Sequence, residues 1–509
     1  MTFAHMLAAT LPALQFPSGA DVVHLLPELI VGGGFIVTMV LDTLIPPSRK
    51  SWLAAWSLLV LLASGAVTVI DWVTVGGQQI SVYAESFSYD RFGLFINALI
   101  LIAAIFVVAL SPSYLERQKI HHGEFYSLIL AASAGMMFLG SSESLMMVFL
   151  SIEVLSLALY LLSGFRRGNT KSQEAGFKYF LMGGFASAIL LMGMALVYGE
   201  TGHTQLPAIA QVVAADLQSV DPLLLTGIVL VFVGLGFKVS AAPFHMWTPD
   251  VYEGAPLAVT AFMSVATKVA AFAAILRIFS VALTPLYTHW EVAVSAISIL
   301  SMLIGNLVAL RQTNIKRMLA YSGIAQAGYM LIGVAVSGSA AIAGVLVYLA
   351  AYTLSTFGVL AGVMLVAKGD DDSSSYRSLR GLGHAHPYVA AMMALSLLSL
   401  AGFPPLLGFW GKFFVFTSAI QNGQIALAIW GVLTSAISIF YYIRVILILY
   451  SPQESEQGGT VSWLAPARVG AVVVGLGVAA TVVLGVFVPV VYHLALSARD
   501  ALLVRIAAP

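Results

Sequence analysis

Four ionisable side chains lie in apolar runs, where a charge is costly, and each of them could carry a proton. Glu153 lies within the run LMMVFLSIEVLSLALYLL, and Lys238, Lys268 and Lys412 lie in three other apolar runs. A charged side chain at the centre of a bilayer costs at least about 2.5–3.5 kcal/mol, so such residues are candidates for function. Carboxyl groups and amines can both exchange protons in buried sites. The chemistry that these residues indicate is proton transfer.

Each of these residues also has a structural interpretation. Glu153 could be a neutral acid in a helix contact, and Lys268 could belong to a structural salt bridge. Lys238 and Lys412 could extend their ammonium groups to the membrane interface. Anchoring at that interface is the favoured interpretation for two arginines nearer the helix ends, Arg277 and Arg444.

Prolines lie beside two of the lysines. Pro243 follows Lys238, and Pro404 and Pro405 precede Lys412. Proline removes a helical hydrogen bond and kinks the helix, and the freed backbone groups must then meet water or protein. Interrupted helices near ionisable residues are typical of the mid-membrane ion sites of transporters. We therefore expect two interrupted helices, the first of which opens Lys238 to water.

Glu153 and Lys238 could act together as a switch. A nearby carboxylate stabilises the ammonium form of a buried lysine. A change in the distance between the two side chains would therefore make the lysine hold or release its proton. The sequence does not show that the two residues meet in space.

The composition excludes several classes of protein. Of the 509 residues, 60% are hydrophobic and 9% are charged, whereas soluble proteins carry about 25% charged residues. Twenty-three basic and twenty-three acidic residues cancel, so no net charge attracts nucleic acid. The absence of cysteine excludes disulfides, thiolate metal ligands and Fe–S clusters in this chain. No HExxH or GxxxxGK[ST] motif is present, and we expect no cofactor of the chain's own.

The apolar runs predict fourteen membrane spans, because a spanning helix needs about 20 apolar residues. A short amphipathic surface helix is predicted at 205–219. The predicted spans are 25–45, 52–71, 91–110, 125–140, 145–164, 175–198, 223–247, 256–281, 290–310, 318–337, 340–367, 387–420, 424–450 and 468–491.

The distribution of basic residues predicts the orientation. If the N-terminus is outside, fifteen Lys and Arg fall in inside loops, three fall in outside segments and five remain in the spans. Inside loops are enriched in Lys and Arg, and a missed span would have scrambled this alternation. The sequence therefore predicts an all-α polytopic membrane protein with both termini on the outer side.

One stretch carries a resemblance to a known family. The sequence FKVSAAPFHMWTPDVYEGAP (237–256) resembles the signature of subunit N of bacterial NADH–quinone oxidoreductase (complex I), whose family includes mitochondrial subunit 2. The resemblance runs from about Glu28 to Ser451. It also covers FLSIEVLSLALYLLSGF, EAGFKYFLMGGFASAILLMG, NIKRMLAYSGIAQAGYMLIG and LSLAGFPPLLGFWGKFFVF.

The resemblance implies an architecture. Members of this family have fourteen helices, with two inverted five-helix repeats (helices 4–8 and 9–13) and interrupted helices 7 and 12. The implied segments are N-terminal helices 1–3, a first repeat, a second repeat, and a C-terminal helix 14 with its tail, at 1–110, 125–281, 290–450 and 468–509.

The resemblance also implies roles for the site residues. Glu153 and Lys238 would form the switch, Lys268 the relay, and Lys412 the outward proton donor. Relatives often have a histidine where this sequence has Gln326, and glutamine cannot titrate, which puts a protonation role there in doubt. Secondary candidates are His245, Asp250, Glu253, Gln326, Pro243 and Pro405.

The implied function is proton translocation within an NADH–quinone oxidoreductase of the bacterial plasma membrane, with both termini periplasmic. The chain would contact the bilayer, sister antiporter-like subunits and small membrane subunits. NADH, FMN, Fe–S clusters and a quinone would be used elsewhere in the complex. The alternative is a subunit of a secondary cation/proton antiporter with the same fold, and the VYEGAP ending (251–256) favours the first interpretation.

Overall fold

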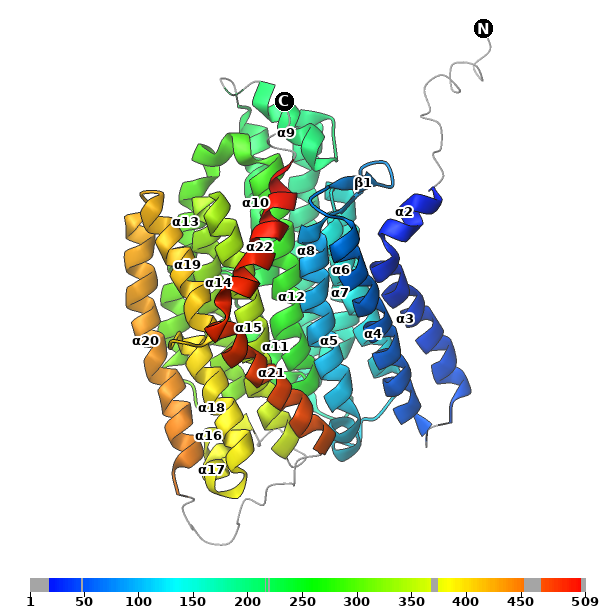
Figure 1. Ribbon diagram of the computed structural model, residues 1–509, viewed down its shortest axis with the longest axis vertical. Helices are drawn as coiled ribbons and strands as arrows, with labels where there is room; N and C mark the ends of the chain where they lie inside the picture. Colours follow the sequence, from blue (N-terminus) through cyan, green and yellow to red (C-terminus); the bar gives the residue numbers. More distant parts are fainter. Residues whose placement is uncertain are drawn as a thin grey trace.

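The computed structural model describes residues 18–46, 49–215, 217, 220–367, 374–452 and 468–504. They form a bundle of helices whose axes follow the long axis of the molecule (Figure 1). Within these residues, twelve helices are long and apolar enough to cross a membrane, or thirteen if the bent pair α21–α22 counts as one span. The chain is a multi-pass membrane protein, as predicted.

The spans are helical because, in lipid, a helix satisfies all its backbone polar groups internally. The predicted short span at 125–140 is confirmed as α6, and the predicted boundary near Ser337 separates α14 from α15. The twelve spanning helices are α3 (Leu26–Leu44), α4 (Ser51–Thr74), α5 (Arg91–Arg117), α6 (Glu124–Ser141), α7 (Leu145–Ser163), α8 (Thr170–Thr201), α10 (Pro222–Val239), α12 (Leu257–Arg277, continued by the π-helical turn η2, Ile278–Ala282), α13 (Tyr287–Ala309, preceded by the 3-10 turn η3, Thr284–Leu286), α14 (Ile315–Val336), α15 (Ser339–Val366) and α20 (Ile425–Tyr450).

Two of the predicted spans are interrupted, as the prolines indicated. The span predicted at 223–247 is α10 followed by a break and the short helix α11 (Thr248–Gly254). The span predicted at 387–420 is two helices, α18 (Pro387–Ala401) and α19 (Leu407–Gln421). Each first helix ends in the left-handed backbone region, at Ser240 (φ +62°) and Gly402 (φ +94°), and cis peptide bonds precede Pro243 and Pro405.

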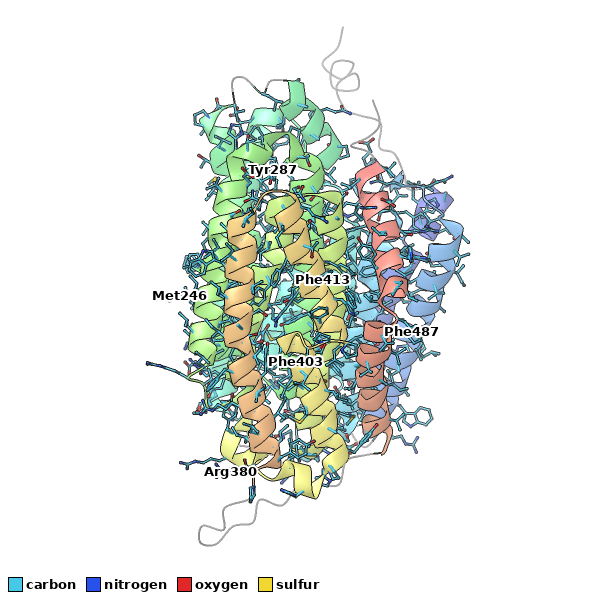
Figure 2. All side chains as sticks on the ribbon, turned by 60° about the vertical axis from the view of Figure 1, so that its left-hand side comes forward. Met246, Tyr287, Arg380, Phe403, Phe413 and Phe487 are labelled. Carbon is cyan, nitrogen blue, oxygen red and sulfur yellow. The ribbon has the colours of Figure 1, made fainter. Side chains whose placement is uncertain are left out.

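The C-terminal span differs from the prediction. Instead of one helix over 468–491, the chain forms α21 (Arg468–Val486) and α22 (Val488–Leu503), which are bent by 87° relative to each other. Pro489 lies in the first turn of α22, where proline starts a new helix but cannot continue the preceding one. The Trp410 indole N–H of α19 donates to the Gly485 carbonyl (2.8 Å). The bend at Phe487 thus lies close to the break that contains Phe403 (Figure 2).

The two ends of the bundle carry different short elements. At one end, called here the hairpin end, β1 (Ile80–Val82) and β2 (Phe87–Tyr89) form an antiparallel hairpin near α2 (Gly19–His24) and α9 (Leu206–Ala215) (Figure 1). The helix α9 lies within the predicted amphipathic segment 205–219, whose residues 216, 218 and 219 lie outside the described residues. The opposite end carries α16 (Tyr376–Leu379) and α17 (Leu382–Ala385).

Two helices form the centre of the bundle. The apolar windows of α12 and α15 are wholly buried, whereas those of α3, α4 and α20 are 28%, 39% and 33% buried, because these helices lie on the outside of the bundle. One of the four candidate residues, Lys268, lies on a central helix, and the other three lie on α7, α10 and α19. The division of the bundle into two inverted five-helix repeats stays a prediction.

Candidate functional site

Three lysines are buried at the middle of the bundle. Lys238 on α10, Lys268 on α12 and Lys412 on α19 are 4%, 0% and 5% exposed. Within the described part of the chain, none of them has a carboxylate within 4.0 Å. Extension of Lys238 or Lys412 to the membrane interface is therefore excluded in this structure, and so is a salt bridge at Lys268. Each ammonium group instead contacts a hydroxyl group and an aromatic ring, and that of Lys412 also contacts a carbonyl.

Lys238 faces the helix that carries Glu153. Its ammonium group donates to the Ser156 hydroxyl of α7 at 2.6 Å and lies 5.6 Å from the ring centroid of Tyr160. Glu153 precedes Ser156 by three residues, so the two side chains are neighbours on one face of α7. Glu153 and Lys238 form no ion pair within 4.0 Å, and Glu153 Oε1 is buried with no partner among the described groups.

The backbone polar groups at the break after Lys238 form hydrogen bonds with side chains. The Ala242 N–H donates to the Ser301 hydroxyl of α13 at 2.8 Å, and the Trp247 indole donates to the Phe237 carbonyl at 3.1 Å. These bonds replace the backbone bonds that Pro243 and the left-handed turn remove. Water access to Lys238 through the break stays a prediction.

Aromatic rings connect the surroundings of Lys238 to those of Lys268. Tyr179 stacks on Trp247 with ring centroids 4.4 Å apart, and Trp247 meets Tyr252 of α11 edge-on at 6.2 Å. The Lys268 ammonium group lies 3.5 Å from the Tyr252 hydroxyl. The interrupted helix therefore reaches both lysines, because Lys238 is in its first half and Tyr252 is in its second half.

Lys268 also lies close to α14 and to a buried tyrosine hydroxyl. Gly323 lies against both Lys268 and Tyr352: a methyl group at this position would be 3.4 Å from the lysine nitrogen and 3.0 Å from the tyrosine hydroxyl. That hydroxyl is buried and has no hydrogen-bond partner among the described groups. Gln326 follows Gly323 by three residues, so both lie on one face of α14.

Gln326 is buried and fully engaged. Its amide nitrogen donates to the Leu400 carbonyl and to the Tyr442 hydroxyl, each at 3.1 Å, and its amide oxygen accepts from Tyr348. The Leu400 carbonyl is one of those freed at the end of α18. Glutamine therefore serves here as a neutral connector between α14, α15, α18 and α20, and the structure gives it no partner that requires a charge.

Lys412 binds the second break directly. Its ammonium group donates to the Ala401 carbonyl at 3.0 Å and to the Ser435 hydroxyl of α20 at 2.9 Å, and it lies 5.0 Å from the Tyr329 ring centroid. The last carbonyls of α18 carry the negative end of the helix dipole, which favours a cation. The end of α18 thus supplies one acceptor for the buried ammonium group, and α20 supplies the other.

The secondary candidates Asp250 and Glu253 lie on α11, toward the opposite end. Asp250 accepts from Lys178 of α8 at 2.8 Å and from Arg317 of α14 at 2.9 Å. Glu253 also accepts from Arg317, at 2.9 Å. Partial burial alone would raise the pKa of Asp250, but the two cations outweigh it and lower that pKa. A cavity of about 200 Å³ lies among these charges, so α11 is tied electrostatically to two long helices.

The remaining candidates have no comparable set of contacts. His245 is half-buried in the first break, and its Nδ1 has no partner among the described groups. Pro243 and Pro405 are exposed, and their contribution is to the backbone of the two breaks. No group of three or more metal-ligating side chains occurs within the described ranges.

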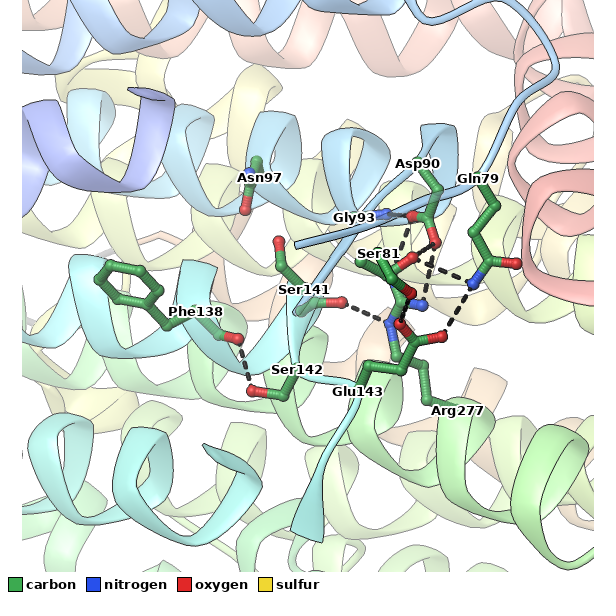
Figure 3. A network of polar contacts seen from close by, with 12 residues as sticks. Gln79, Ser81, Asp90, Gly93, Asn97, Phe138, Ser141, Ser142, Glu143 and Arg277 are labelled. Atoms are coloured by element: carbon green, nitrogen blue, oxygen red, sulfur yellow. Dashed lines mark hydrogen bonds and ion pairs between the residues drawn. The ribbon is translucent and has the colours of Figure 1, made fainter. Parts of the chain in front are cut away.

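The structure corrects the prediction that Arg277 anchors a helix end at the membrane interface. Arg277 is not an interfacial anchor: it is 2% exposed and forms a buried bidentate ion pair with Asp90, with nitrogen–oxygen distances of 3.0 and 2.8 Å. Its Nε also donates to the Gly140 carbonyl at 2.7 Å. Figure 3 shows this pair within a network that includes Gln79 and Glu143. Arg444 does lie near a helix end, where it donates to the Leu310 carbonyl at 3.1 Å.

The acids of this network were not among the residues predicted from the sequence. Glu28 on α3 and Glu143 before α7 are each 2% exposed, and Asp90 is 1% exposed. Asp90 also caps α5, because its Oδ1 accepts from the Gly93 N–H at 2.7 Å. The sequence could have predicted the capping role of Asp90, because aspartate directly before an apolar helix is a common N-cap. Its partner Arg277 is 187 residues away and carried no such signal.

Comparison with known proteins places the chain in a family. The family model described as "NADH:quinone oxidoreductase/Mrp antiporter, TM" matches residues 142–438. The chain belongs to this family. Within the family, it is 42% identical over 453 residues to NADH-quinone oxidoreductase subunit N of Trichlorobacter lovleyi, covering 89% of this chain and 92% of that one. It is 40% identical to subunit N of Salinibacter ruber, covering 90% and 92%.

Solved structures agree with this assignment. A chain of respiratory complex I from Thermus thermophilus matches with a TM-score of 0.78 and 32% identity, covering 92% of this chain and 98% of that chain. A chain of the Mrp complex from a Dietzia species matches with a TM-score of 0.81 and 22% identity, covering 94% and 97%. At 22% identity the second likeness shows a shared fold alone.

Proposed function

We propose that this chain is the proton-translocating membrane subunit of an NADH–quinone oxidoreductase. Electron transfer from NADH through FMN and Fe–S clusters to a quinone would occur in other subunits. The chain would assemble with sister antiporter-like subunits and small membrane subunits in the bacterial plasma membrane. The hairpin end would face the periplasm, together with both termini.

One observation carries this proposal: three buried lysines, none with a carboxylate partner among the described residues, are linked by successive polar and aromatic contacts. The series starts at Glu153, passes Lys238, Lys268 and Gln326, and ends at Lys412. Lysine can lose its proton in a buried site, whereas arginine cannot. A structural role would favour paired cations, as at Arg277, because an unpaired buried charge is strongly destabilising.

The proposed sequence of events uses the two breaks. Approach of the Glu153 carboxylate to Lys238 stabilises the ammonium form, and separation favours proton release. The proton passes by way of bound water and the Tyr252 hydroxyl to Lys268, and then by way of bound water near Gln326 to Lys412. Lys412 is held by the carbonyl end of α18 and releases the proton outward.

The alternative function is that of a subunit in a cation/proton antiporter complex. The likeness to the Mrp complex supports only the shared fold, whereas relatives at about 40% identity are named subunit N. The two functions differ in electron transfer. If the chain purifies with Fe–S subunits and with quinone-reducing activity, the antiporter alternative is wrong.

The test of the relay is Lys268→Arg. Arginine keeps the positive charge but cannot deprotonate, so proton pumping per electron in reconstituted vesicles should fall at least tenfold, while the complex still assembles. Glu153→Gln should also lower pumping strongly. The matched control is Lys50→Arg, at a partly exposed ion pair with Asp42, which should pump normally. Normal pumping by the Lys268 variant would rule out the relay role.

A further inference from the structure

The inner side of α20 carries a row of hydroxyl-bearing side chains. The helix itself lies at the edge of the bundle (Figure 1). The spacing of the row places its members on one side of the helix, and four of the five are at most 1% exposed. Buried hydroxyl groups in a membrane helix either hold helices together or serve a polar path. The row consists of Thr434, Ser435, Ser438, Tyr441 and Tyr442.

Tyr442, at one end of the row, joins two polar side chains of α14. Its hydroxyl accepts from the Gln326 amide at 3.1 Å and shares a hydrogen bond with the Ser322 hydroxyl, in which either oxygen can donate. The other amide N–H of Gln326 donates to the Leu400 carbonyl, and its oxygen accepts from Tyr348. Gln326 is thus fixed, and the Tyr442 proton can point toward Ser322 or away from it.

The Ser322 end of this bond lies close to Lys268. Ser322 is 1% exposed and directly precedes Gly323. A methyl group at Gly323 would be 3.4 Å from the Lys268 nitrogen, so α14 borders the ammonium group within one residue of Ser322. The Ser322–Tyr442 bond therefore connects the surroundings of Lys268 to α20.

The other end of the row reaches Lys412. The Lys412 ammonium group donates to the Ser435 hydroxyl at 2.9 Å. Ser435 precedes Tyr442 by seven residues, which is two turns or about 10 Å along the helix. Ser438 lies between them on the same face; its hydroxyl donates to the Ser435 carbonyl at 2.6 Å and keeps its acceptor sites. The row thus spans the distance between Lys412 and the Ser322–Tyr442 bond.

Hydroxyl groups and amides differ as carriers of protons. A hydroxyl group has one proton to donate and two acceptor sites, so it can receive a proton on one side while it gives up its own on the other. A side-chain amide has separate donor and acceptor atoms, so Gln326 orients Tyr442 but does not pass a proton on. Reversal of the Ser322–Tyr442 bond moves one proton toward α20 and leaves both oxygens uncharged.

We propose that Tyr442 carries the proton between Lys268 and Lys412. The inference rests on the proposed function and adds α20 to its relay. The Lys268 ammonium group releases one proton toward Ser322, the Ser322–Tyr442 bond reverses, and water bound along Ser438 delivers one proton to the Lys412 amine. Each hydroxyl group gives one proton and receives one, so the net change is a neutral Lys268 and a charged Lys412.

The neighbouring tyrosine provides a matched control. Tyr441 is 1% exposed, and its hydroxyl donates to the Asn306 amide oxygen at 3.0 Å. The path ends there, because an amide does not pass the proton on. Tyr441→Phe therefore removes an equally buried hydroxyl group from the same helix, away from the proposed path. It should lower heat stability about as much as Tyr442→Phe does, but it should pump normally.

The test is the rate of proton pumping per assembled complex in vesicles. Tyr442→Phe keeps the ring and removes the hydroxyl group, so pumping should fall several-fold. Ser322→Ala removes the other hydroxyl group of the same bond and should give a similar fall; if Tyr442→Phe does not assemble, this variant decides. The two changes together should be little worse than either alone, because both disable one step.

The outcomes separate this inference from the proposed function. A fall in Tyr442→Phe and Ser322→Ala, with normal pumping in Tyr441→Phe, supports the inference. If the first two variants pump like the wild type, Tyr442 carries no proton and the inference is wrong. An equal fall in Tyr441→Phe would mean that both tyrosines only hold α20 in place, which also refutes the inference. In either case the relay stands as long as Lys268→Arg abolishes pumping, and it fails if that variant pumps normally.

Discussion

The buried ion pair between Asp90 and Arg277 allows a quantitative test of how the hairpin end is held together. The perturbation is a double-mutant cycle of Asp90→Asn, Arg277→Met and the two together. Asparagine is as good an N-cap as aspartate, so the bond to the Gly93 N–H survives in the first variant. The change therefore removes the negative charge with little loss of helix capping.

The expected magnitude follows from burial and geometry. Both side chains are at most 2% exposed, and breaking a buried pair by removing one partner costs about 3–5 kcal/mol. Asp90→Asn should lie near the upper value, because it leaves the Arg277 charge buried with only the Gly140 carbonyl as a full acceptor. Arg277→Met should lie near the lower value, because Asp90 keeps donors from Gly93 and Ser88.

The double variant should be less damaging than the sum of the singles. Once both charges are gone, no uncompensated charge is buried, so the coupling between the two changes should be about 2–3 kcal/mol. The assay is the fraction of detergent-solubilised protein that stays folded after graded heating, measured by size-exclusion chromatography. The control is Asp42→Asn, whose partly exposed pair with Lys50 should contribute only about 0–1 kcal/mol.

Two outcomes would refute this reasoning. If the fraction of folded protein after heating were the same for Asp90→Asn as for the wild type, the stability of the chain would not depend on the charge that pairs with Arg277. If the two single losses simply added in the double variant, the side chains would act independently.

Three further predictions concern other parts of the chain. Gln326→Leu should leave the Tyr348 hydroxyl and the Leu400 carbonyl without their partner, at about 1–3 kcal/mol each, and should lower pumping per assembled complex; wild-type pumping would contradict the connector role. Gly411→Ala places a methyl group 2.9 Å from the Cα of Tyr348 and should cost about 1–3 kcal/mol in heating assays; Gly33→Ala, with open space around it, is the control and should be tolerated. Asp250→Asn should destabilise the chain at pH 7, and this loss should shrink as the pH falls from the ordinary carboxyl pKa of 3.8 through the lowered pKa of Asp250, because the contribution is complete above the first value and absent only below the second; a loss that does not shrink with falling pH would argue against the ion network.

The sequence predicted the features that depend on local composition. Apolar runs of membrane length, interrupted by prolines beside Lys238 and Lys412, were sufficient to predict both breaks. The three lysines are functional candidates by sequence alone, because a cation in an apolar run is costly unless it is paired or reaches the interface. Their burial without a carboxylate partner among the described residues removes both of those structural explanations.

The sequence could not predict features that depend on distant partners. Arg277 lies near a helix end and looks like an anchor until Asp90, from another helix end, is seen beside it. Glu28 looks like an acid in a first helical turn, and its donors Asn97 and Ser141 are 69 and 113 residues away. The bend at Phe487 depends partly on the packing of Gly485 against the α18–α19 break, which no local pattern records.

The complete burial of α12 and α15 bears on how the chain is synthesised. Two cations, Lys268 and Arg277, enter the membrane with α12, and each disfavours insertion of an isolated helix. The partners of Arg277 on α5 and α6 are made earlier and can receive it at once. The neighbours of Lys268 at Gly323 and Tyr352 emerge from the ribosome later. We therefore expect a nascent chain that stops before α15 to leave one side of α12 open to lipid, and to be removed by the proteases that clear unfinished membrane proteins.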